Sequence, residues 1–377
     1  MPTANVIYPE FDRPLSEDAE RSWTLPSRYY FDPAIYGAER EKIFFKSWQY
    51  VGHQSQVANP GDYITGYIVD QPVFVVRDRK GVLKGYYNVC LHRAHELLKG
   101  AGSLKSAAIT CPYHAWAYDF EGTLRAAPNC KNVKDFNVED FKLMPIQVEM
   151  FAGFVFVNLD PDAKPMKDQV GWLADDLRKH VPDFDNLKLI ENTTFGDTTT
   201  KANWKVVVDN YVECYHCPKA HPAFADMIEM TEYKNEIIGP ISRQLGLNTR
   251  PKNDAYEFSP DAPVTHAAFW FMWPNITFNM LPGETQLSVA VVQPKAVEEC
   301  VFWAHIYGHK PERDPARVAY GRDVLGPEDT SLCESVQRGL HCRVYKQGRI
   351  IVDPERSGIA EQGIHHFHRM VKQALDR

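Results

Sequence analysis

Two short motifs in the first third of the chain combine cysteine with histidine. They are Cys90-Leu91-His92 and Cys111-Pro112-Tyr113-His114, and eighteen residues separate them. Thiolates and neutral imidazoles are ligands that transition metals prefer. Because the two donors of each motif lie only two or three residues apart, two adjacent loops can bring all four donors to one metal centre. We therefore expect these four side chains to form a metal site.

Four such ligands suit two kinds of centre. Tetrahedral zinc takes two thiolates and two imidazoles, whereas a Rieske [2Fe–2S] cluster places both cysteines on one iron and both histidines on the other. Each motif follows an apolar or alternating run, at residues 85–89 and 107–110, as hairpin tips of a small β domain would. No helix of the zinc-finger type follows them. The surroundings favour the Rieske cluster.

A second group of metal-binding residue types lies between residues 209 and 221. We predict a helix over 206–217, because Pro218 disfavours the helical conformation at the residue before it. His221 then follows a bend, and on one continuous helix it would point about 140° away from His216. The bend allows both imidazoles to reach one ion. The helix also carries Asp209, Asn210 and Glu213.

Two histidines need a carboxylate to complete the facial triad that leaves positions open on non-haem Fe(II). Glu213 is close in sequence, but Asp329 is the better candidate. In a predicted helix over 328–340 it lies on the apolar stripe that should face the core, with Cys333, Val336 and Leu340. A carboxylate there needs a partner, whereas Glu328 lies about 100° away and Glu334 on the opposite face. The alternative for Asp329 is stabilisation of the helix N-terminus.

The cysteines near the second site allow a rival interpretation. Cys214, His216, Cys217 and His221 could form a zinc knuckle, but no second cysteine pair supports a closed structural site. We favour core packing for Cys214 and Cys217. In a reducing compartment, eight cysteines argue for metal ligation and core filling and against a disulfide framework.

The elements that would position these residues indicate an α+β fold in three parts. Residues 1–45 form an arm and a helix from Pro33 that packs on the last part. Residues 46–160 form an all-β domain with strands at 63–69, 72–77 and 82–89. Residues 161–377 begin with a proline-containing linker at 161–165, followed by a helix at 170–180, and end in two C-terminal helices. Between them lie antiparallel strands at 266–280, 286–294 and 300–309.

Composition excludes several function classes. The 377 residues carry a net charge of −7 and no basic block, which argues against nucleic acid as a partner. The longest apolar run, 151–159, is about half a membrane span and is read as a buried strand. The N-terminal residues lack the pattern of a signal peptide. We expect a cytoplasmic protein.

Together the two motifs resemble the oxygenase subunits of the Rieske non-haem iron oxygenases. The resemblance runs from Cys90 to Asp329 and includes the box Asn203-Trp204-Lys205 before Glu213-x-x-His216-x4-His221. It implies a Rieske domain and a catalytic helix-grip domain that holds mononuclear Fe(II), with O2 as co-substrate. It also implies a homotrimer, fed with electrons by a separate NAD(P)H-dependent flavin and iron–sulfur reductase.

In that family a carboxylate at the Glu213 position bridges a Rieske histidine of one subunit, His114 by analogy, to His216 of the next. Most members that attack aromatic rings carry Asp there. The run from Glu213 to Cys217, and the closing stretch 363–368, are similar to the subgroup acting on quaternary ammonium compounds, such as carnitine monooxygenases and glycine betaine and stachydrine demethylases.

A substrate of that class is recognised by aromatic faces, and Phe269, Phe271 and Trp273 alternate onto one face of a predicted strand. A packed core explains them equally well. The function implied is hydroxylation of a C–H bond next to nitrogen, which gives N-demethylation or C–N cleavage. The alternatives are an aromatic-ring hydroxylating dioxygenase or O-demethylase of the same family, and, from another class, a Rieske electron carrier or zinc-stabilised binding protein.

Overall fold

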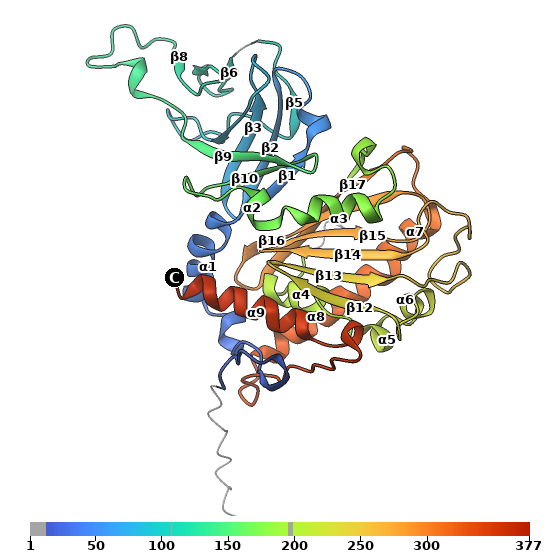
Figure 1. The fold of residues 1–377 in the computed structure, drawn as a ribbon. Helices are drawn as coiled ribbons and strands as arrows, with labels where there is room; N and C mark the ends of the chain where they lie inside the picture. Colours follow the sequence, from blue (N-terminus) through green and yellow to red (C-terminus); the bar gives the residue numbers. More distant parts are fainter. Residues whose placement is uncertain (1–12, 107, 195–198) are drawn as a thin grey trace, which may run out of the picture. The chain divides into compact units, whose positions relative to one another are not determined.

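The computed structural model describes residues 13–106, 108–194 and 199–377 (Figure 1). The chain divides into two compact units. The small unit is Phe44–Asp176, and the large unit is Met1–Ile43 together with Leu177–Arg377. This division assigns residues 161–176 to the small unit, whereas the sequence reading places its boundary at residue 160.

The small unit is built from antiparallel sheets. One sheet has the strand order β1-β10-β9-β4-β3-β2-β5, and a second consists of β6-β7-β8. Helix α2 (Met166–Val170) and the start of α3 (Trp172–His180) follow them. The strands are β1 (Gln49–His53), β2 (Asp62–Ile68), β3 (Gln71–Arg77), β4 (Leu83–Tyr87), β5 (Ala101–Ser103), β6 (Ile109–Thr110), β7 (Ala117–Tyr118), β8 (Leu124–Ala126), β9 (Pro145–Phe151) and β10 (Phe154–Asn158).

Turn chemistry explains two of these hairpins. Between β3 and β4, the Asp78 carboxylate accepts hydrogen bonds from the amides of Lys80 and Val82, both at 2.8 Å. Between β9 and β10, Ala152 and Gly153 have φ angles of 50° and 80°, as a two-residue hairpin loop requires. The expectation of one strand over 151–159 is therefore wrong, because the apolar run spans a hairpin.

The large unit is organised by a seven-stranded antiparallel sheet in the order β11-β17-β16-β15-β14-β13-β12. Together the two units confirm the predicted α+β class. The strands are β11 (Lys188–Thr194), β12 (Lys234–Ile238), β13 (Ile241–Gly246), β14 (Ala267–Met272), β15 (Ile276–Met280), β16 (Gln286–Ala296) and β17 (Glu299–Gly308). The helices are α1 (Pro33–Lys42), α4 (Trp204–Tyr211), α5 (Cys217–Ala220), α6 (Pro222–Met227), α7 (Pro315–Ala319), a π-helical segment η7 (Tyr320–Leu325), α8 (Gly326–Leu340) and α9 (Gln362–Leu375).

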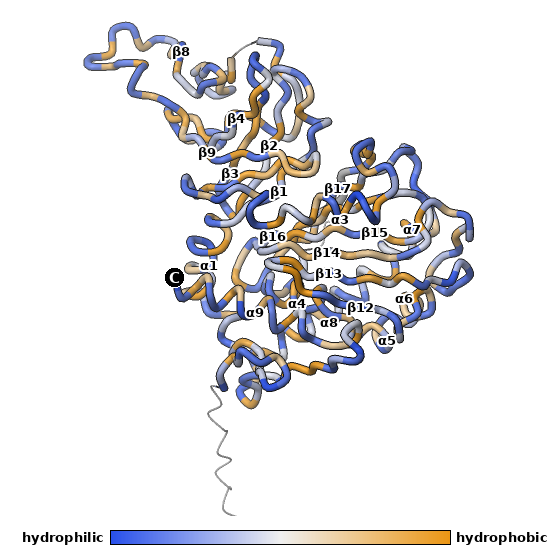
Figure 2. The backbone as a smooth tube through the Cα atoms, viewed as in Figure 1, coloured by the Kyte–Doolittle hydropathy of each residue, from blue (hydrophilic) through white to orange (hydrophobic). Residues whose placement is uncertain are grey.

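Helices α4, α8 and α9 cover one face of this sheet (Figure 1). Phe367 of α9 lies between them and the sheet, with its ring centroid 5.5 Å from that of Trp204 and 5.6 Å from that of Phe271. On the other face, His180 at the end of α3 contacts Trp270. Figure 2 shows that hydrophobic residues gather along the central strands and that the connecting loops are mostly hydrophilic.

The segment predicted as one strand over 266–280 is two strands. Trp273 and Pro274 are joined by a cis peptide bond between β14 and β15, which pair with each other. Proline cannot donate to the sheet, so a turn replaces the strand here. Phe269 and Phe271 still share a face of β14, as the alternation predicts.

A buried ion pair joins the N-terminal helix to α4. Lys205 Nζ lies 2.5 Å from Glu39 Oε1, and both side chains are fully buried. Trp204 donates from Nε1 to Glu39 Oε2 at 2.8 Å. The motif Asn203-Trp204-Lys205 therefore fixes α1 against the start of α4, while the Asn203 side chain caps that helix. No helix in the described part of the chain combines the length and apolar character needed to cross a membrane.

Candidate active site

The two motifs of the small unit form loops of the same shape. In the first loop, Cys90 N donates to His95 O at 2.8 Å, and Ala94 N donates to Cys90 O at 3.0 Å. Ala94 and Ala115 have φ angles of 55° and 58°, so both loops close through a left-handed residue. The second loop repeats the two hydrogen bonds with Cys111, Ala115 and Trp116.

The four donor side chains of these loops come together with the cysteines inside and the histidines outside. Cys90 and Cys111 are each 2% exposed, while His92 and His114 are exposed with ring centroids 4.5 Å apart. Trp116 stacks on His92 at 4.9 Å. A buried thiol pair and an exposed imidazole pair fit a cluster with one iron on each. Ala107, at the start of the run before the second loop, lies outside the described residues.

Tyr118 is a contact that sequence reasoning missed. Its hydroxyl lies 3.5 Å from Cys90 Sγ and accepts a hydrogen bond from Leu91 N at 3.1 Å. Hydrogen bonds around cysteine sulfurs tune the potential of iron–sulfur clusters. The only signal in the sequence was a tyrosine in an apolar stretch, which by itself predicts core packing.

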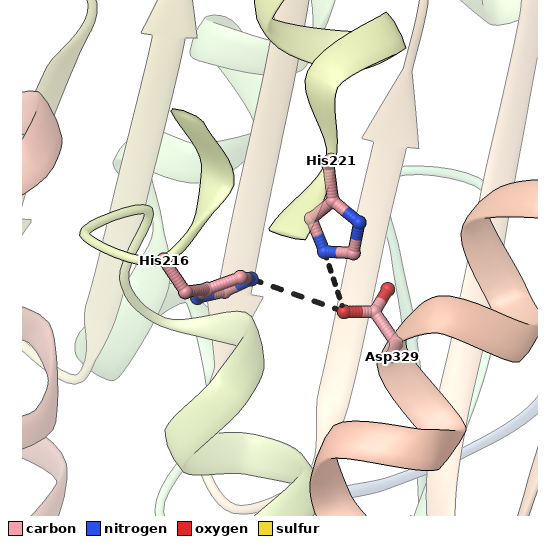
Figure 3. Close-up of side chains that lie close together, drawn as sticks. All are labelled: His216, His221 and Asp329. Atoms are coloured by element: carbon pink, nitrogen blue, oxygen red, sulfur yellow. Dashed lines mark hydrogen bonds and ion pairs between the residues drawn. The ribbon is translucent and has the colours of Figure 1, made fainter. Parts of the chain in front are cut away.

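In the large unit, His216, His221 and Asp329 converge on one point (Figure 3). Each offers a ligand atom, and these atoms lie within 4.8 Å of one another. Asp329 Oδ1 is 2.9 Å from His221 Nε2 and 3.9 Å from His216 Nε2. His216 precedes α5, His221 separates α5 from α6, and Asp329 lies in the first turn of α8.

A carboxylate contacts each imidazole at Nδ1, the ring nitrogen that does not face the common point. Glu328 Oε2 lies 2.7 Å from His221 Nδ1, and Glu213 Oε1 contacts His216 Nδ1. A carboxylate at Nδ1 fixes the tautomer with the proton there, so the lone pair of Nε2 faces the common point. Burial lowers the pKa of His221, and the hydrogen bonds to Asp329 and Glu328 raise it by more. Two imidazoles and one carboxylate fit a facial triad.

The helix that carries these residues ends earlier than predicted. Helix α4 stops at Tyr211, and Glu213 and His216 lie in the connection to α5. The Glu213 carboxylate accepts hydrogen bonds from the amides of Tyr215 and His216. This local ring of hydrogen bonds, in place of helical spacing, brings Glu213 to the His216 imidazole. The predicted bend before His221 is confirmed, since Pro222 begins a separate helix.

Cys214 and Cys217 form a disulfide. The expectation of two free core cysteines is therefore wrong, although both residues are buried, at 3% and 4% exposed. Their spacing on either side of His216 brings the two sulfurs together as the connection turns. Bonded sulfurs are not thiolate ligands, so the disulfide also excludes the zinc knuckle with His216 and His221.

A cavity of about 300 Å³ opens onto the triad. Its wall is largely aromatic and apolar, with rings from Tyr211, Phe224, Tyr233, Phe269 and Phe302. Only Phe269 was expected from the sequence. Phe271 and Trp273 instead pack on Phe367, at 5.6 and 6.0 Å between ring centroids. These two residues therefore belong to the packed core, the alternative that the sequence allowed equally.

Asp209 and Asn210 have different surroundings. Asn210 lines the cavity and donates from Nδ2 to Asp329 Oδ1 at 2.6 Å, so it positions that carboxylate. Asp209 accepts a hydrogen bond from Tyr30 at 2.7 Å and lies 2.9 Å from His368 Nε2. It holds the N-terminal segment against α9, and the structure does not bring it to the triad.

Comparison with known proteins matches both units. Residues 47–137 match the Rieske [2Fe–2S] domain, and residues 178–377 match the ring hydroxylating alpha subunit (catalytic domain). A carnitine monooxygenase oxygenase subunit of Escherichia coli (strain K12) is 39% identical over 98% of this chain and 99% of its own length. A chloroplastic choline monooxygenase of Atriplex hortensis is 32% identical over 95% of this chain and 79% of its own.

Solved structures agree with these matches. A quaternary ammonium Rieske monooxygenase in complex with its substrate L-carnitine has a TM-score of 0.84 and 37% identity, covering 97% of this chain and 99% of that one. The chain is therefore an oxidoreductase that belongs to the Rieske oxygenases, which combine a [2Fe–2S] domain with a non-haem iron domain and use O2.

Proposed function

We propose that this chain is the oxygenase component of a two-component monooxygenase that hydroxylates a C–H bond next to the nitrogen of a quaternary ammonium substrate, of the betaine or carnitine kind. The observation that carries the proposal is the aromatic cavity of about 300 Å³ that opens onto His216, His221 and Asp329. A quaternary ammonium ion donates no hydrogen bond and is recognised by aromatic faces. The carnitine and choline monooxygenases among its relatives support the same substrate class.

His216, His221 and Asp329 would hold the mononuclear iron, and the two loops of the small unit would hold the [2Fe–2S] cluster through Cys90, His92, Cys111 and His114. When bound, these groups supply electrons and activate O2 for attack on the substrate. The donor sets fit both groups, because the thiols are buried, the imidazoles of the small unit are exposed, and the triad offers two nitrogens and one oxygen.

The residues around the triad orient its side chains and form the substrate-binding cavity. Glu213 and Glu328 keep the protons of His216 and His221 on Nδ1, and Asn210 holds the Asp329 carboxylate through a hydrogen bond. The aromatic wall excludes water and holds the cationic head, so that a C–H bond next to nitrogen faces the triad. Hydroxylation of an N-methyl group gives a carbinolamine, which collapses to formaldehyde and the demethylated amine. Hydroxylation of the chain carbon on nitrogen instead gives a carbinolamine that releases trimethylamine and leaves the chain carbon as an aldehyde.

Glu213 is our candidate for the electron-transfer bridge between His114 of one subunit and His216 of the next. Its Oε1 already contacts His216 Nδ1, which is half of such a bridge. A homotrimer, a separate NAD(P)H-dependent reductase and a cytoplasmic location complete the proposal.

The test is reductase- and O2-dependent turnover of the iron-loaded protein with carnitine, glycine betaine, proline betaine, choline and simple aromatic acids. We expect formaldehyde or trimethylamine from at least one quaternary ammonium compound. A hydroxylated aromatic acid, with no product from any betaine or from choline, would replace the proposal with the ring-hydroxylating or O-demethylating alternative. An electron carrier without catalysis would contain no mononuclear iron, so an iron count accompanies the assay.

A further inference from the structure

Two arginines line the cavity that opens onto the triad. Arg317 lies in α7, and Arg313 lies in the connection just before the N-cap of that helix, so the two arginines reach the cavity from one short segment. The other charged residues that line the cavity are Glu213 and Asp329. Those two carboxylates are occupied by His216, His221 and Asn210. The cavity therefore has an acidic side at the triad and a basic side at α7.

The guanidinium groups on the basic side are only partly satisfied. Arg313 Nη1 lies 2.8 Å from Glu191 Oε2, but its buried Nε has no acceptor among the residues that the structure describes. Arg317 donates from Nη1 to the carbonyl of Glu284 at 3.2 Å. Within the described residues, no carboxylate lies at ion-pair distance from Arg317.

The surroundings of Arg317 leave its charge without a counter-ion. Burial, together with repulsion from Arg313, lowers the pKa of Arg317, and Tyr256 and Asp314 oppose this only in part. Asp314 caps α7 by accepting a hydrogen bond from Ala316 N at 2.9 Å. Arg317 is partly buried, and a cation withdrawn from water without a counter-ion is costly. The planar fork of arginine fits a carboxylate in two-point contact.

We propose that Arg317, assisted by Arg313, binds the carboxylate of a zwitterionic substrate. This inference rests on the proposed function and deepens it, because it names the residues that would hold the carboxylate of a betaine- or carnitine-like substrate and would disfavour choline, which has no carboxylate. Eleven residues separate Arg317 in α7 from Asp329 in α8, with the π-helical η7 between them, so the two side chains reach the cavity from positions about three helical turns apart. Several bonds between the nitrogen and the carboxylate suit that separation better than the single methylene of glycine betaine.

The test compares two forms of one ligand, 4-(trimethylammonio)butyrate and its methyl ester. They share the cationic head and the chain length, and only the first carries the negative charge. We expect the iron-loaded wild-type protein to bind the carboxylate about 10- to 100-fold more tightly than the ester in equilibrium dialysis, the range for hydrogen bonds to charged groups. Arg317→Gln should remove this preference by weakening carboxylate binding alone, and KM for the carboxylate should rise more than kcat falls.

Arg322→Gln is the matched control. Arg322 follows on the same helical stretch, but it is exposed and pairs with its neighbour Asp323, so this variant should keep the preference. Equal binding of acid and ester by the wild type would overturn the inference and leave the proposed function standing, even if Arg317→Gln failed to fold. A parallel loss of both ligands in a folded, iron-loaded Arg317→Gln protein would also overturn it. No binding of either form would overturn the inference. The proposed function would fall with it only if the quaternary ammonium compounds of the panel above also gave no product.

Discussion

Glu328 and His221 are joined at the ring nitrogen that does not face Asp329. Glu328 Oε2 lies 2.7 Å from His221 Nδ1, while Asp329 Oδ1 lies 2.9 Å from Nε2 of the same ring. Two consecutive carboxylates of α8 thus contact the two ring nitrogens of one imidazole. The roughly 100° between neighbouring helical residues separates a ligand from the group that orients it.

Glu328→Ala should weaken iron binding at the triad without removing a ligand. Loss of the carboxylate behind a ligating histidine costs about 10- to 100-fold in metal affinity, because the ring orientation and tautomer are no longer fixed. Iron retention against a graded series of chelator concentrations measures this. Glu334→Ala is the control, since Glu334 contacts Lys201 N and not the triad. Equal retention by the two variants would show that Glu328 does not support the site.

Asp329→Ala should remove the mononuclear iron and spare the [2Fe–2S] cluster. The triad loses its only carboxylate and Asn210 its acceptor, whereas the loops of Cys90 and Cys111 lie in the other unit. We expect the iron content to fall from about three to about two atoms per chain, with an unchanged visible spectrum of the cluster. A variant that kept about three irons would exclude Asp329 as a ligand.

The sequence predicted which side chains come together at the two candidate sites better than it predicted the backbone that carries them. The sequence predicted that Cys90, His92, Cys111 and His114 come together, because fixed spacing within a tight loop is a local property, and their role as cluster ligands stays a prediction.

The sequence placed Asp329 near the two histidines because a carboxylate on an apolar stripe needs a partner, and the structure brings the three together. The stripe itself was predicted too wide, since Cys333 and Leu340 are buried but Val336 is 51% exposed. The same angular argument rejected Glu328 as a ligand. That argument tests whether a side chain reaches the metal, and it does not test whether the side chain reaches Nδ1 of a histidine that binds the metal.

Other features depend on contacts of individual side chains, some local and some between distant segments, which periodicity does not report. The end of α4 at Tyr211 follows from the Glu213 side chain capturing the next amides, and proline-based reasoning placed it six residues too late. The separation of Phe269 from Phe271 and Trp273 depends on where α9 covers the sheet. The arginines of the cavity carried no motif at all.

Glu213→Gln should leave both metal sites loaded and nearly abolish turnover. The amide keeps the size of the side chain but loses the charge that holds the proton of His216 on Nδ1. We expect kcat to fall by about two orders of magnitude or more, the scale of a lost proton acceptor, and the reduced cluster to reoxidise slowly in a single turnover. Glu213→Asp, which keeps the charge, should recover part of the rate. Full activity of the Gln variant would contradict the bridge.

Glu361 should make the large unit less stable as the pH rises towards neutrality. Burial raises the pKa of Glu361 from 4.5 to about 7, with added repulsion from Glu213 and Asp209, and the hydrogen bond from Ile351 N opposes the shift. Between these values the folded state binds the extra proton. The contribution to stability is therefore complete below pH 4.5 and is lost as the pH rises through about 7.

Glu361→Gln removes this titration. Relative to the wild type, the variant should gain in unfolding temperature between pH 5 and pH 8, and only this difference is compared because other carboxylates titrate in both proteins. A difference in unfolding temperature between the two proteins that did not change with pH would contradict the raised pKa. It would mean that the Glu361 carboxyl is exposed to water in the folded state.

Gly363→Ala should disturb the candidate iron site indirectly, through the contact of α9 with the end of α4. A Cβ at residue 363 would lie 2.0 Å from the carbonyl oxygen of Val212, a backbone atom that cannot rotate away, so α9 must shift. Overpacking of this kind costs about 1–3 kcal/mol. Because Val212 immediately precedes Glu213, activity should fall along with the unfolding temperature.

Gly339→Ala tests whether this effect belongs to the contact or to the loss of a helical glycine. Gly339 is exposed on α8, and a Cβ there meets nothing within 4 Å. The added methyl group should therefore stabilise the protein by about 0.5–1 kcal/mol, the ordinary advantage of alanine over glycine in a helix. Opposite signs for the two substitutions would locate the requirement for glycine in the Val212 contact. A stabilising effect at both positions would mean that α9 can shift without a cost in free energy of unfolding. In that case the packing of α9 would not hold Glu213 in place.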